Sequence, residues 1–450
     1  MKKFLLVLSI TIPTLWVGIA NPVQAQRSAA EYFDEGNTKA RAGDFAGALQ
    51  SYSAVVAMNP DHAPSFFNRG LAKANLKDHR GAIIDYDRAI EINSKEAVYY
   101  QSRGVSKSMQ DDHRSAVQDY TRAIELNPDD AKSYYNRGVS RAKLDNQRGA
   151  MEDFNKATTL DPNDVLALYA RGSSKQQLED YAGCLADFSR VIDLNPKRSG
   201  AYAGRAYAKI KLGDYKGAIG DYTKAIELNP EDGLAYGYRG FAKAKVDDFS
   251  GAIADYDKAL QVNPNSYESY YGRGFAKSKL GDQRGAILDL TRAVEINNSY
   301  TTDPKKIVYM GPINRSVLDA LRGQVQEQVK INPLSQERAE AYFIRGLSKS
   351  KSGDAKGAIQ DMNSAVELDP TYSDAYFSRG LVKSATGDQM GAILDCSSAI
   401  KLKAGHSEAF YVRGIVKHSL GDVNGGCLDL SKAGELGYTP AYKVISDYCN

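Results

Sequence analysis

The sequence predicts an all-α solenoid, in which short helices stack in chain order instead of closing into a globule. The first observation is a repeat. The stretch from Gly240 to Pro264 reads GFAKAKVDDFSGAIADYDKALQVNP, and its frame starts again at Gly274, thirty-four residues after Gly240. The second observation is a regular alternation of two kinds of turn: turns with Gly and Asp alternate along the chain with turns that carry Asn-Pro or Asp-Pro. A fixed period of this length is typical of arrays whose units bury their apolar faces only against neighbours.

Eleven copies of this frame share a small residue near the start, typically followed by alanine, an aromatic residue, alanine and proline at twelve, sixteen, nineteen and twenty-four residues further on. The small residues are Gly36, Gly70, Gly104, Gly138, Gly172, Ala206, Gly240, Gly274, Gly346, Gly380 and Gly414. From about Ala29 to Tyr438 this frame resembles the tetratricopeptide repeat family. The resemblance implies a right-handed superhelical solenoid of antiparallel helix pairs with 34-residue repeats. It also implies a concave groove lined by the first helix of each pair, and members of the family mostly bind peptides or other proteins.

The start and end of the frame predict the organisation of the chain. We expect a signal peptide over residues 1–25, repeats 1 to 8 over 29–300, an insertion or a degenerate repeat with one helix over 301–338, repeats 9 to 11 over 339–440, and a capping helix over 441–450. A solenoid needs such a cap because an open end exposes its core.

The N-terminal leader reads MKKFLLVLSITIPTLWVGIANPVQA. Two lysines precede an apolar run, and small residues before Gln26 suit a cleavage site, so the segment is typical of a bacterial secretory signal. The alternative is an uncleaved membrane anchor, which the interruption at Pro13 disfavours. No second apolar stretch is long enough to span a bilayer. We therefore expect an exported protein, periplasmic or extracellular, without stable membrane insertion after signal cleavage.

Within each repeat, capping residues such as Ser28 start the first helix, and a turn such as GDF, GDY or DDF joins it to the second. A following Asn-Pro or Asp-Pro ends the second helix. Aromatic rings recur four residues before the small position, and we interpret them as core. They are Tyr32, Phe66, Tyr100, Tyr134, Tyr202, Tyr236, Tyr270, Tyr342, Tyr376 and Phe410.

Charged residues recur in the same register. Arginine precedes the small residue in ten repeats, a basic residue follows three later in all eleven, and aspartate follows fifteen later in the same ten. The first repeat has Glu35 and Ser51 instead, so arginine and aspartate are lost together. This joint loss predicts Arg–Asp pairs between the two helices of a repeat. The alternative is a basic ladder that binds an anionic ligand.

The segment from Thr301 to Arg338 does not fit the frame. Pro304, Gly311 and Pro312 make its first part irregular, and Ser316 to Lys330 predicts one amphipathic helix. Such an insertion would either kink the superhelix or fold into the groove as a lid, and the sequence does not decide between the two.

The candidate partner-binding groove is set by helical phase, because residues three before, one after and five after the small position point away from the core face. Its aromatic members are Phe67, Tyr135, Tyr169, Tyr271, Phe343, Phe377 and Tyr411 three before, and Tyr207, Phe241 and Phe275 one after. Its basic members are Lys143, Lys211, Lys245, Lys279 and Lys351. Rings give large contact area and lysines attract acids, so we expect a protein or peptide partner with acidic character. The alternative is that the rings pack against the next repeat and the lysines form a solvated face.

Some members of the family bind C-terminal carboxylates with a clamp of lysines and asparagines. Asn37 and Asn68 occupy clamp-like positions, but Phe33 and Val98 stand where the clamp needs lysines. We therefore do not expect this clamp here.

Four cysteines fall into two groups. Cys184 and Cys396 replace core residues of their second helices, and we expect both to be buried thiols. Cys427 and Cys449 lie on the last second helix and the capping helix, twenty-two residues apart. In an exported protein these two can form a disulfide, and the alternative is two free thiols.

Nothing in the sequence predicts catalysis. His79 and His113 occupy the same turn in adjacent repeats, but no closed ligand set accompanies them, so we predict no metal site and no cofactor. No phosphate loop, HExxH motif or nucleophile elbow is present. With 58 basic and 55 acidic residues the chain lacks the charge excess of a nucleic-acid-binding protein. The sequence thus predicts a non-catalytic interaction scaffold or adaptor. The alternative is a self-associating structural spacer, and the sequence does not fix the oligomeric state.

Overall fold

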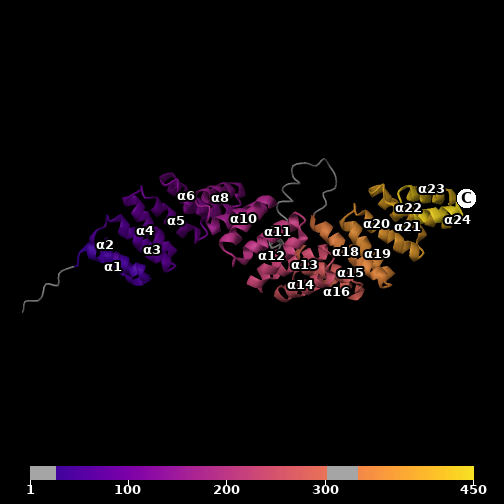
Figure 1. Ribbon diagram of the computed structural model, residues 1–450, viewed down its shortest axis with the longest axis horizontal. Coiled ribbons are helices and arrows are strands. Elements are labelled where there is room, and N and C mark those ends of the chain that lie inside the picture. Colours follow the sequence, from indigo (N-terminus) through magenta and orange to yellow (C-terminus); the bar gives the residue numbers. More distant parts are fainter. Residues whose placement is uncertain (1–26, 302–332, 450) are drawn as a thin grey trace, which may run out of the picture. The chain divides into compact units, whose positions relative to one another are not determined.

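The computed structural model describes residues 27–301 and 333–449 (Figure 1). The expected signal peptide over 1–25 and the expected helix over 316–330 lie outside these residues. Within the described ranges the chain is all-α, without strands, and consecutive helices pack as antiparallel pairs. The chain forms two compact units, Met1–Leu160 and Asp161–Asn450.

The first unit holds four helix pairs, each made of a first and a second helix. The pairs are α1 (Ala29–Arg41) with α2 (Phe45–Met58), α3 (Ala63–Asn75) with α4 (His79–Ile92), α5 (Ala97–Ser108) with α6 (His113–Leu126), and α7 (Ala131–Lys143) with α8 (Gln147–Leu160). Within this unit, α2, α4 and α6 also pack against the first helix of the following pair.

In its described residues, the second unit holds seven pairs and a final helix. They are α9 (Val165–Gln177) with α10 (Tyr181–Leu194), α11 (Ser199–Lys211) with α12 (Tyr215–Leu228), α13 (Gly233–Lys245) with α14 (Phe249–Val262), α15 (Tyr267–Lys279) with α16 (Gln283–Thr301), α18 (Pro333–Lys351) with α19 (Ala355–Leu368), α20 (Ser373–Ala385) with α21 (Gln389–Leu402), α22 (Ser407–Ser419) with α23 (Val423–Glu435), and α24 (Pro440–Tyr448).

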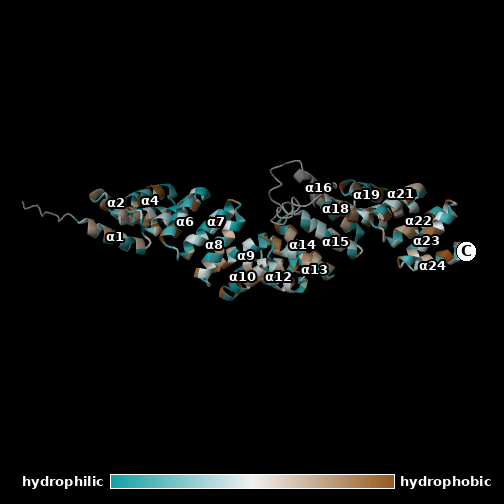
Figure 2. Cartoon of the chain, turned by 90° about the horizontal axis from the view of Figure 1, so that it is seen from above, coloured by the Kyte–Doolittle hydropathy of each residue, from teal (hydrophilic) through white to brown (hydrophobic). Residues whose placement is uncertain are grey.

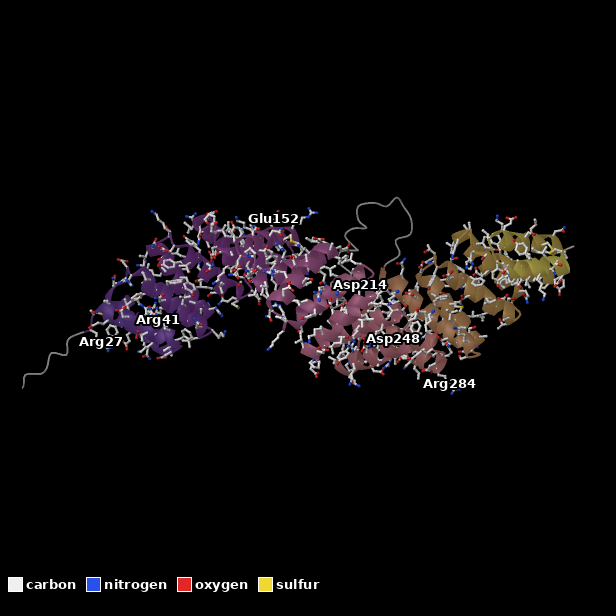
Figure 3. All side chains as sticks on the ribbon, viewed as in Figure 1. Arg27, Arg41, Glu152, Asp214, Asp248 and Arg284 are labelled. Carbon is white, nitrogen blue, oxygen red and sulfur yellow. A yellow bond between two sulfur atoms is a disulfide. The ribbon has the colours of Figure 1, made fainter. Side chains whose placement is uncertain are left out.

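The turn inside a pair is built the same way from repeat to repeat. Asp214 and Asp248 cap α12 and α14, and each carboxylate accepts a hydrogen bond of 2.9 Å from the backbone N–H three residues later (Figure 3). This bond satisfies one of the free N–H groups at the helix start. The preceding turn residue has a positive φ, which suits Gly213 before α12.

The core lies between the two helices of each pair. The residue sixteen after the small position is fully or almost fully buried in every repeat, and in seven repeats it is aromatic. At Gly240 an added Cβ would lie 3.1 Å from the ring of Tyr256, so the small residue lets the ring approach the backbone. The rings four before the small residue differ from our core interpretation. They are half-buried, and Tyr236, for example, lies beneath the guanidinium of Arg239, with 5.5 Å from Cζ to ring centroid.

The stack continues directly from α16 to α18. Arg345 Nη1 donates to Thr291 Oγ1 at 3.2 Å, which repeats the contact of 3.1 Å between Arg239 and Thr223 in adjacent repeats. The hydroxyl of Tyr267 also donates to the carbonyl of Glu337 at 3.1 Å. Repeats 8 and 9 therefore contact one another directly, through the same kind of bond that joins adjacent repeats elsewhere.

The C-terminal end is covered by α24, which packs against α23. Cys427 and Cys449 form a disulfide that joins α23 to the end of α24, with their Cα atoms 5.7 Å apart. Cys184 and Cys396 are free and buried, as expected, and burial raises the pKa of each thiol to about 12. In Figure 2 hydrophilic and hydrophobic residues alternate along the helices. Among the described helices, none combines the length and the apolar composition that a membrane span requires.

Candidate interaction surface

The predicted Arg–Asp pairs form in all ten repeats. Between α13 and α14, Arg239 donates from Nε and Nη2 to the two carboxylate oxygens of Asp255, at 2.9 and 2.7 Å. Lys243 binds the same carboxylate at 2.8 Å, so the aspartate has two cations, and it is only 3% exposed. The other aspartates bound in this way are Asp85, Asp119, Asp153, Asp187, Asp221, Asp289, Asp361, Asp395 and Asp429. The arginines are thus structural and do not form a free ladder for an anionic ligand.

The same arginines also join consecutive repeats, which our sequence analysis missed. Arg239 Nη1 donates to Thr223 Oγ1 at 3.1 Å, and Arg379 Nη1 donates to Asn363 Oδ1 at 2.8 Å. The acceptor lies seventeen residues after the small position of the preceding repeat. A polar residue stands there in all eleven repeats, which is the signal that would have revealed it: Ser53, Asp87, Thr121, Asn155, Ser189, Thr223, Asp257, Thr291, Asn363, Ser397 and Ser431.

The titration of the paired aspartates reflects two opposed effects. Burial alone would raise the pKa of Asp221, but hydrogen bonds from Arg205 and Lys209 outweigh it and hold the pKa below its usual value. Asp429 behaves in the same way with Arg413 and Lys417. Both carboxylates are therefore charged at neutral pH and belong to the framework of the fold.

The predicted groove rings three residues before the small position are half-buried, and most pack against a ring or cation of their own or the following repeat. Phe343 meets Tyr372 with ring centroids 4.9 Å apart, and Phe377 meets His406 at 4.7 Å. The remaining contacts are Phe67 with Tyr86 and Tyr99, Tyr135 with Phe154, Tyr169 with Phe188 and Arg198, Tyr271 with Tyr267, and Tyr411 with Tyr438. These rings stabilise the stacking of repeats, and only part of each ring is open to solvent.

The rings one residue after the small position have a different arrangement. Each leans against the first residue of the preceding second helix, with centroid distances of 6.4, 6.4 and 6.2 Å for Tyr207 on Tyr181, Phe241 on Tyr215 and Phe275 on Phe249. The lysine four residues later lies over each ring. Lys211 Nζ is 5.5 Å from the centroid of Tyr207, and the corresponding distance is 5.3 Å for Lys245 over Phe241 and for Lys279 over Phe275. We call these six residues of α11, α13 and α15 the ring–lysine strip.

Two lysines on each of these helices have separate roles. Lys209, Lys243 and Lys277 bind the buried aspartates at 2.8 Å. Two residues further on, Lys211, Lys245 and Lys279 are exposed and form no ion pair with any described residue. The other two predicted groove lysines, Lys143 in the first unit and Lys351 on α18, are also exposed, but they follow Val139 and Leu347 and have no ring beneath them.

Comparison with known families decides the identity of the repeats. Models of the tetratricopeptide repeat match residues 33–97, 131–164, 200–232, 267–300 and 339–372, and a TPR repeat model matches 109–145 and 247–281. Together these matches cover more than half of the chain. The chain belongs to the tetratricopeptide repeat family. Tetratricopeptide repeat proteins generally mediate protein–protein interactions and are typically non-catalytic scaffolds.

Solved structures of the same fold align with parts of this tetratricopeptide repeat chain. YrrB, a TPR protein with an unusual peptide-binding site, is 20% identical over 42% of this chain and 96% of its own, with a TM-score of 0.39. A tetratricopeptide repeat protein of Parabacteroides merdae is 21% identical over 55% and 98%, with a TM-score of 0.40. The C-terminal part of a TPR protein of Cytophaga hutchinsonii is 18% identical over 53% and 98%, with a TM-score of 0.46. No curated protein matches the chain.

The first unit contains a hollow of about 260 Å³ between its first repeats. Its lining residues are Asn37, Ala40, Arg41, Phe45, Tyr52, Asn68, Leu71, Ala72 and Asn75. The two clamp-like asparagines meet here, because Asn68 Nδ2 donates to Asn37 Oδ1 at 3.1 Å. The hydroxyl of Tyr52 donates to the same oxygen at 2.8 Å. These amides are thus bonded to one another, and Arg41 supplies the charge at the hollow (Figure 3).

The part of the chain that the structure describes contains no candidate metal site. No group of three or more His, Cys, Asp or Glu residues there could hold a metal ion. His79 and His113 begin α4 and α6, and Nε2 of His113 lies 3.8 Å from Asp111.

Proposed function

We propose that this chain is an exported, non-catalytic scaffold or adaptor of the cell envelope. It binds a partner protein or an extended peptide on the first helices of its second unit, through the ring–lysine strip. Apolar side chains of the partner pack on Tyr207, Phe241 and Phe275, and its carboxylates pair with the lysines that lie over these rings.

The observation that carries the proposal is that two lysines, two residues apart on the same helix, have different environments. Lys243 is held by Asp255, whereas Lys245 lies over Phe241 with its ammonium group in solvent. Phe241 is itself 38% exposed, and large rings that remain open in a regular array commonly mark contact surfaces. Three successive repeats carry the same arrangement, so an extended segment can meet one ring and one ammonium per repeat.

The export of the protein is supported by its leader sequence, and the absence of a catalytic role is consistent with its family. Periplasmic or extracellular location follows from the same leader. Fractionation of source cells, with mass determination of the mature N-terminus, tests this part of the proposal. Recovery of an uncleaved chain from the cytoplasm would contradict it.

The binding role is tested by affinity capture from envelope extract with the mature chain, beside the variant Phe241→Ala/Phe275→Ala/Lys245→Glu/Lys279→Glu. We expect a partner that the native chain retains and the folded variant loses, and direct titration then gives its Kd. Identical captures by both chains would contradict the strip as the binding surface. In that case concentration-dependent mass by light scattering would favour the alternative of a self-associating spacer.

A further inference from the structure

The hollow of the first unit has the size of a single large side chain. It measures about 260 Å³, and its nine lining residues come from α1, α2 and α3. Sites that hold whole small molecules usually measure roughly 300–1,000 Å³. The hollow therefore suits one side chain of a larger partner better than a free small molecule.

A ring that other repeats supply is missing at this place. Four second helices begin with phenylalanine or tyrosine, namely those that start at Phe45, Tyr181, Tyr215 and Phe249. The last three are each covered by a ring of the following repeat, as Tyr215 is by Phe241 with centroids 6.4 Å apart. At the equivalent position the residue that follows Phe45 is Leu71, which has no ring, and both residues line the hollow. An aromatic ring in the hollow would thus make with Phe45 the contact that Phe241 makes with Tyr215.

The polar part of the lining offers a positive charge and hydrogen-bond donors. Arg41 is the last residue of α1 and forms no ion pair with any described residue (Figure 3). Asn37 Oδ1 already accepts hydrogen bonds from Tyr52 and Asn68, so the Nδ2 group of Asn37, which bonds to no described residue, remains to donate to a ligand. None of the nine lining residues is acidic. Such a lining favours a carboxylate.

This chemistry differs from that of the clamp for C-terminal carboxylates. Phe33 and Val98 stand where that clamp needs lysines, and its two asparagine positions are joined to one another by a hydrogen bond. The charge of the hollow comes from Arg41, and its apolar wall comes from Phe45 and Leu71. The carboxylate of an acidic side chain meets these requirements without a free chain end.

The geometry points to a binding site for an aromatic side chain that stands next to an acidic residue within a partner peptide. The ring enters between Phe45 and Leu71, and the carboxylate pairs with Arg41 and accepts a hydrogen bond from Asn37. Because a guanidinium also stacks on aromatic rings, Arg41 contributes to both contacts. The site lies wholly in the first unit and does not rest on the function proposed above for the second.

Tryptophan fluorescence tests the site, because the single tryptophan of the sequence, Trp16, lies in the expected signal peptide. The full-length mature chain is titrated into a capped synthetic peptide, Gly-Ser-Trp-Asp-Ser-Gly, whose acetyl and amide ends remove the terminal charges. We expect a saturable blue shift of the indole emission, because the ring leaves water. A peptide with lysine in place of aspartate should bind at least about tenfold more weakly.

Two variants test the two parts of the site. Leu71→Phe supplies the ring that Phe241 supplies at the equivalent position, so it should fill the hollow and abolish binding while circular dichroism shows an unchanged fold. Its control is Leu381→Phe, the same exchange at the same position of α20, which should bind as the native chain does. Arg41→Glu should weaken binding at least about tenfold. Its control, Lys351→Glu, reverses an exposed cation at the same position of α18 and should have no effect.

Four results would overturn the proposal. They are the absence of a saturable shift with the native chain, native binding by a folded Leu71→Phe chain, equal binding by the Arg41→Glu and Lys351→Glu chains, and loss of the peptide from the ring–lysine variant alone. The last result would assign the peptide to the ring–lysine strip. A saturable shift that Leu71→Phe abolishes, together with a failed capture by the strip, would contradict only the function proposed for the second unit.

Discussion

Arg239 holds Asp255 with two parallel hydrogen bonds across the helix pair α13–α14, at 2.9 and 2.7 Å, and the carboxylate is only 3% exposed. The geometry is that of a bidentate, charge-assisted contact. Because Arg239 also reaches Thr223 of the preceding repeat, one side chain joins two helices of one repeat and two repeats of the array.

Replacement of Arg239 by alanine should therefore destabilise the second unit. We expect a loss on the order of 3 kcal/mol, because the substitution leaves a buried carboxylate with Lys243 alone. Urea denaturation followed by circular dichroism measures it. Arg292→Ala is the matched control, since Arg292 pairs with Glu295 on the surface of α16 and should cost under about 1 kcal/mol. An unchanged urea denaturation midpoint for the Arg239 variant would contradict the structural role of the Arg239–Asp255 pair.

The stability contributed by Asp221 should depend on pH in a defined direction. Its pKa is lowered in the folded protein, so its contribution is fully present above the unfolded-state pKa of about 4 and is lost as pH falls through the folded value. The difference in unfolding free energy between the native chain and Asp221→Asn should be largest near neutral pH and shrink below about pH 4. A difference that stays constant from neutral to acidic pH would contradict this assignment.

Two glycines of the second unit should respond oppositely to substitution by alanine. A Cβ at Gly272 of α15 would overlap the ring of Tyr256 in the preceding repeat, so Gly272→Ala should destabilise by about 1–3 kcal/mol. At Gly220 of α12 no atom lies within 4 Å of the added Cβ, and Gly220→Ala should stabilise by up to about 1 kcal/mol. Thermal unfolding of the two variants compares them directly, and a shift of both in the same direction would refute the close approach.

The disulfide between Cys427 and Cys449 should secure the C-terminal cap. Peptide mapping without reductant should recover the two cysteines in one linked fragment, and Cys427→Ser/Cys449→Ser should lose about 3 kcal/mol by the loop-closure model. Native Cys184 and Cys396 should resist alkylation, because burial raises the pKa of each thiol to about 12. Four thiols that are alkylated in the unfolded, unreduced chain would rule the bridge out.

The repeat frame predicted most of the fold because its positions recur and can be compared within one chain. The joint absence of arginine and aspartate from the first repeat led to the Arg239–Asp255 pairing, which the structure confirms. The contact from Arg239 to Thr223 was missed, because a polar residue whose identity varies from copy to copy is a weak pattern. The direct stacking of α18 on α16 was equally hidden, since an irregular stretch in sequence says little about the packing of the helices on either side.

The candidate site was harder to derive, since helical phase alone does not tell an open ring from a packed one. Phase placed Phe241 and Phe377 on the same face, but Phe377 is covered by His406 of the next repeat while Phe241 stays 38% exposed. Phe377 lies three residues before its small residue and contacts the following repeat, whereas Phe241 lies one residue after its small residue and leans on Tyr215 of the preceding second helix.

The measurement that tests the central claim most directly is mass-spectrometric footprinting of lysines by acetylation, on the mature chain alone and with its captured partner. We expect Lys211, Lys245 and Lys279 to react several-fold faster than Lys209, Lys243 and Lys277, which are held by buried aspartates. The partner should then protect the first three and leave exposed Lys216 on α12 unchanged. Equal reactivity of the two sets, or a partner that protects none of the first three, would contradict the ring–lysine strip as the interaction surface.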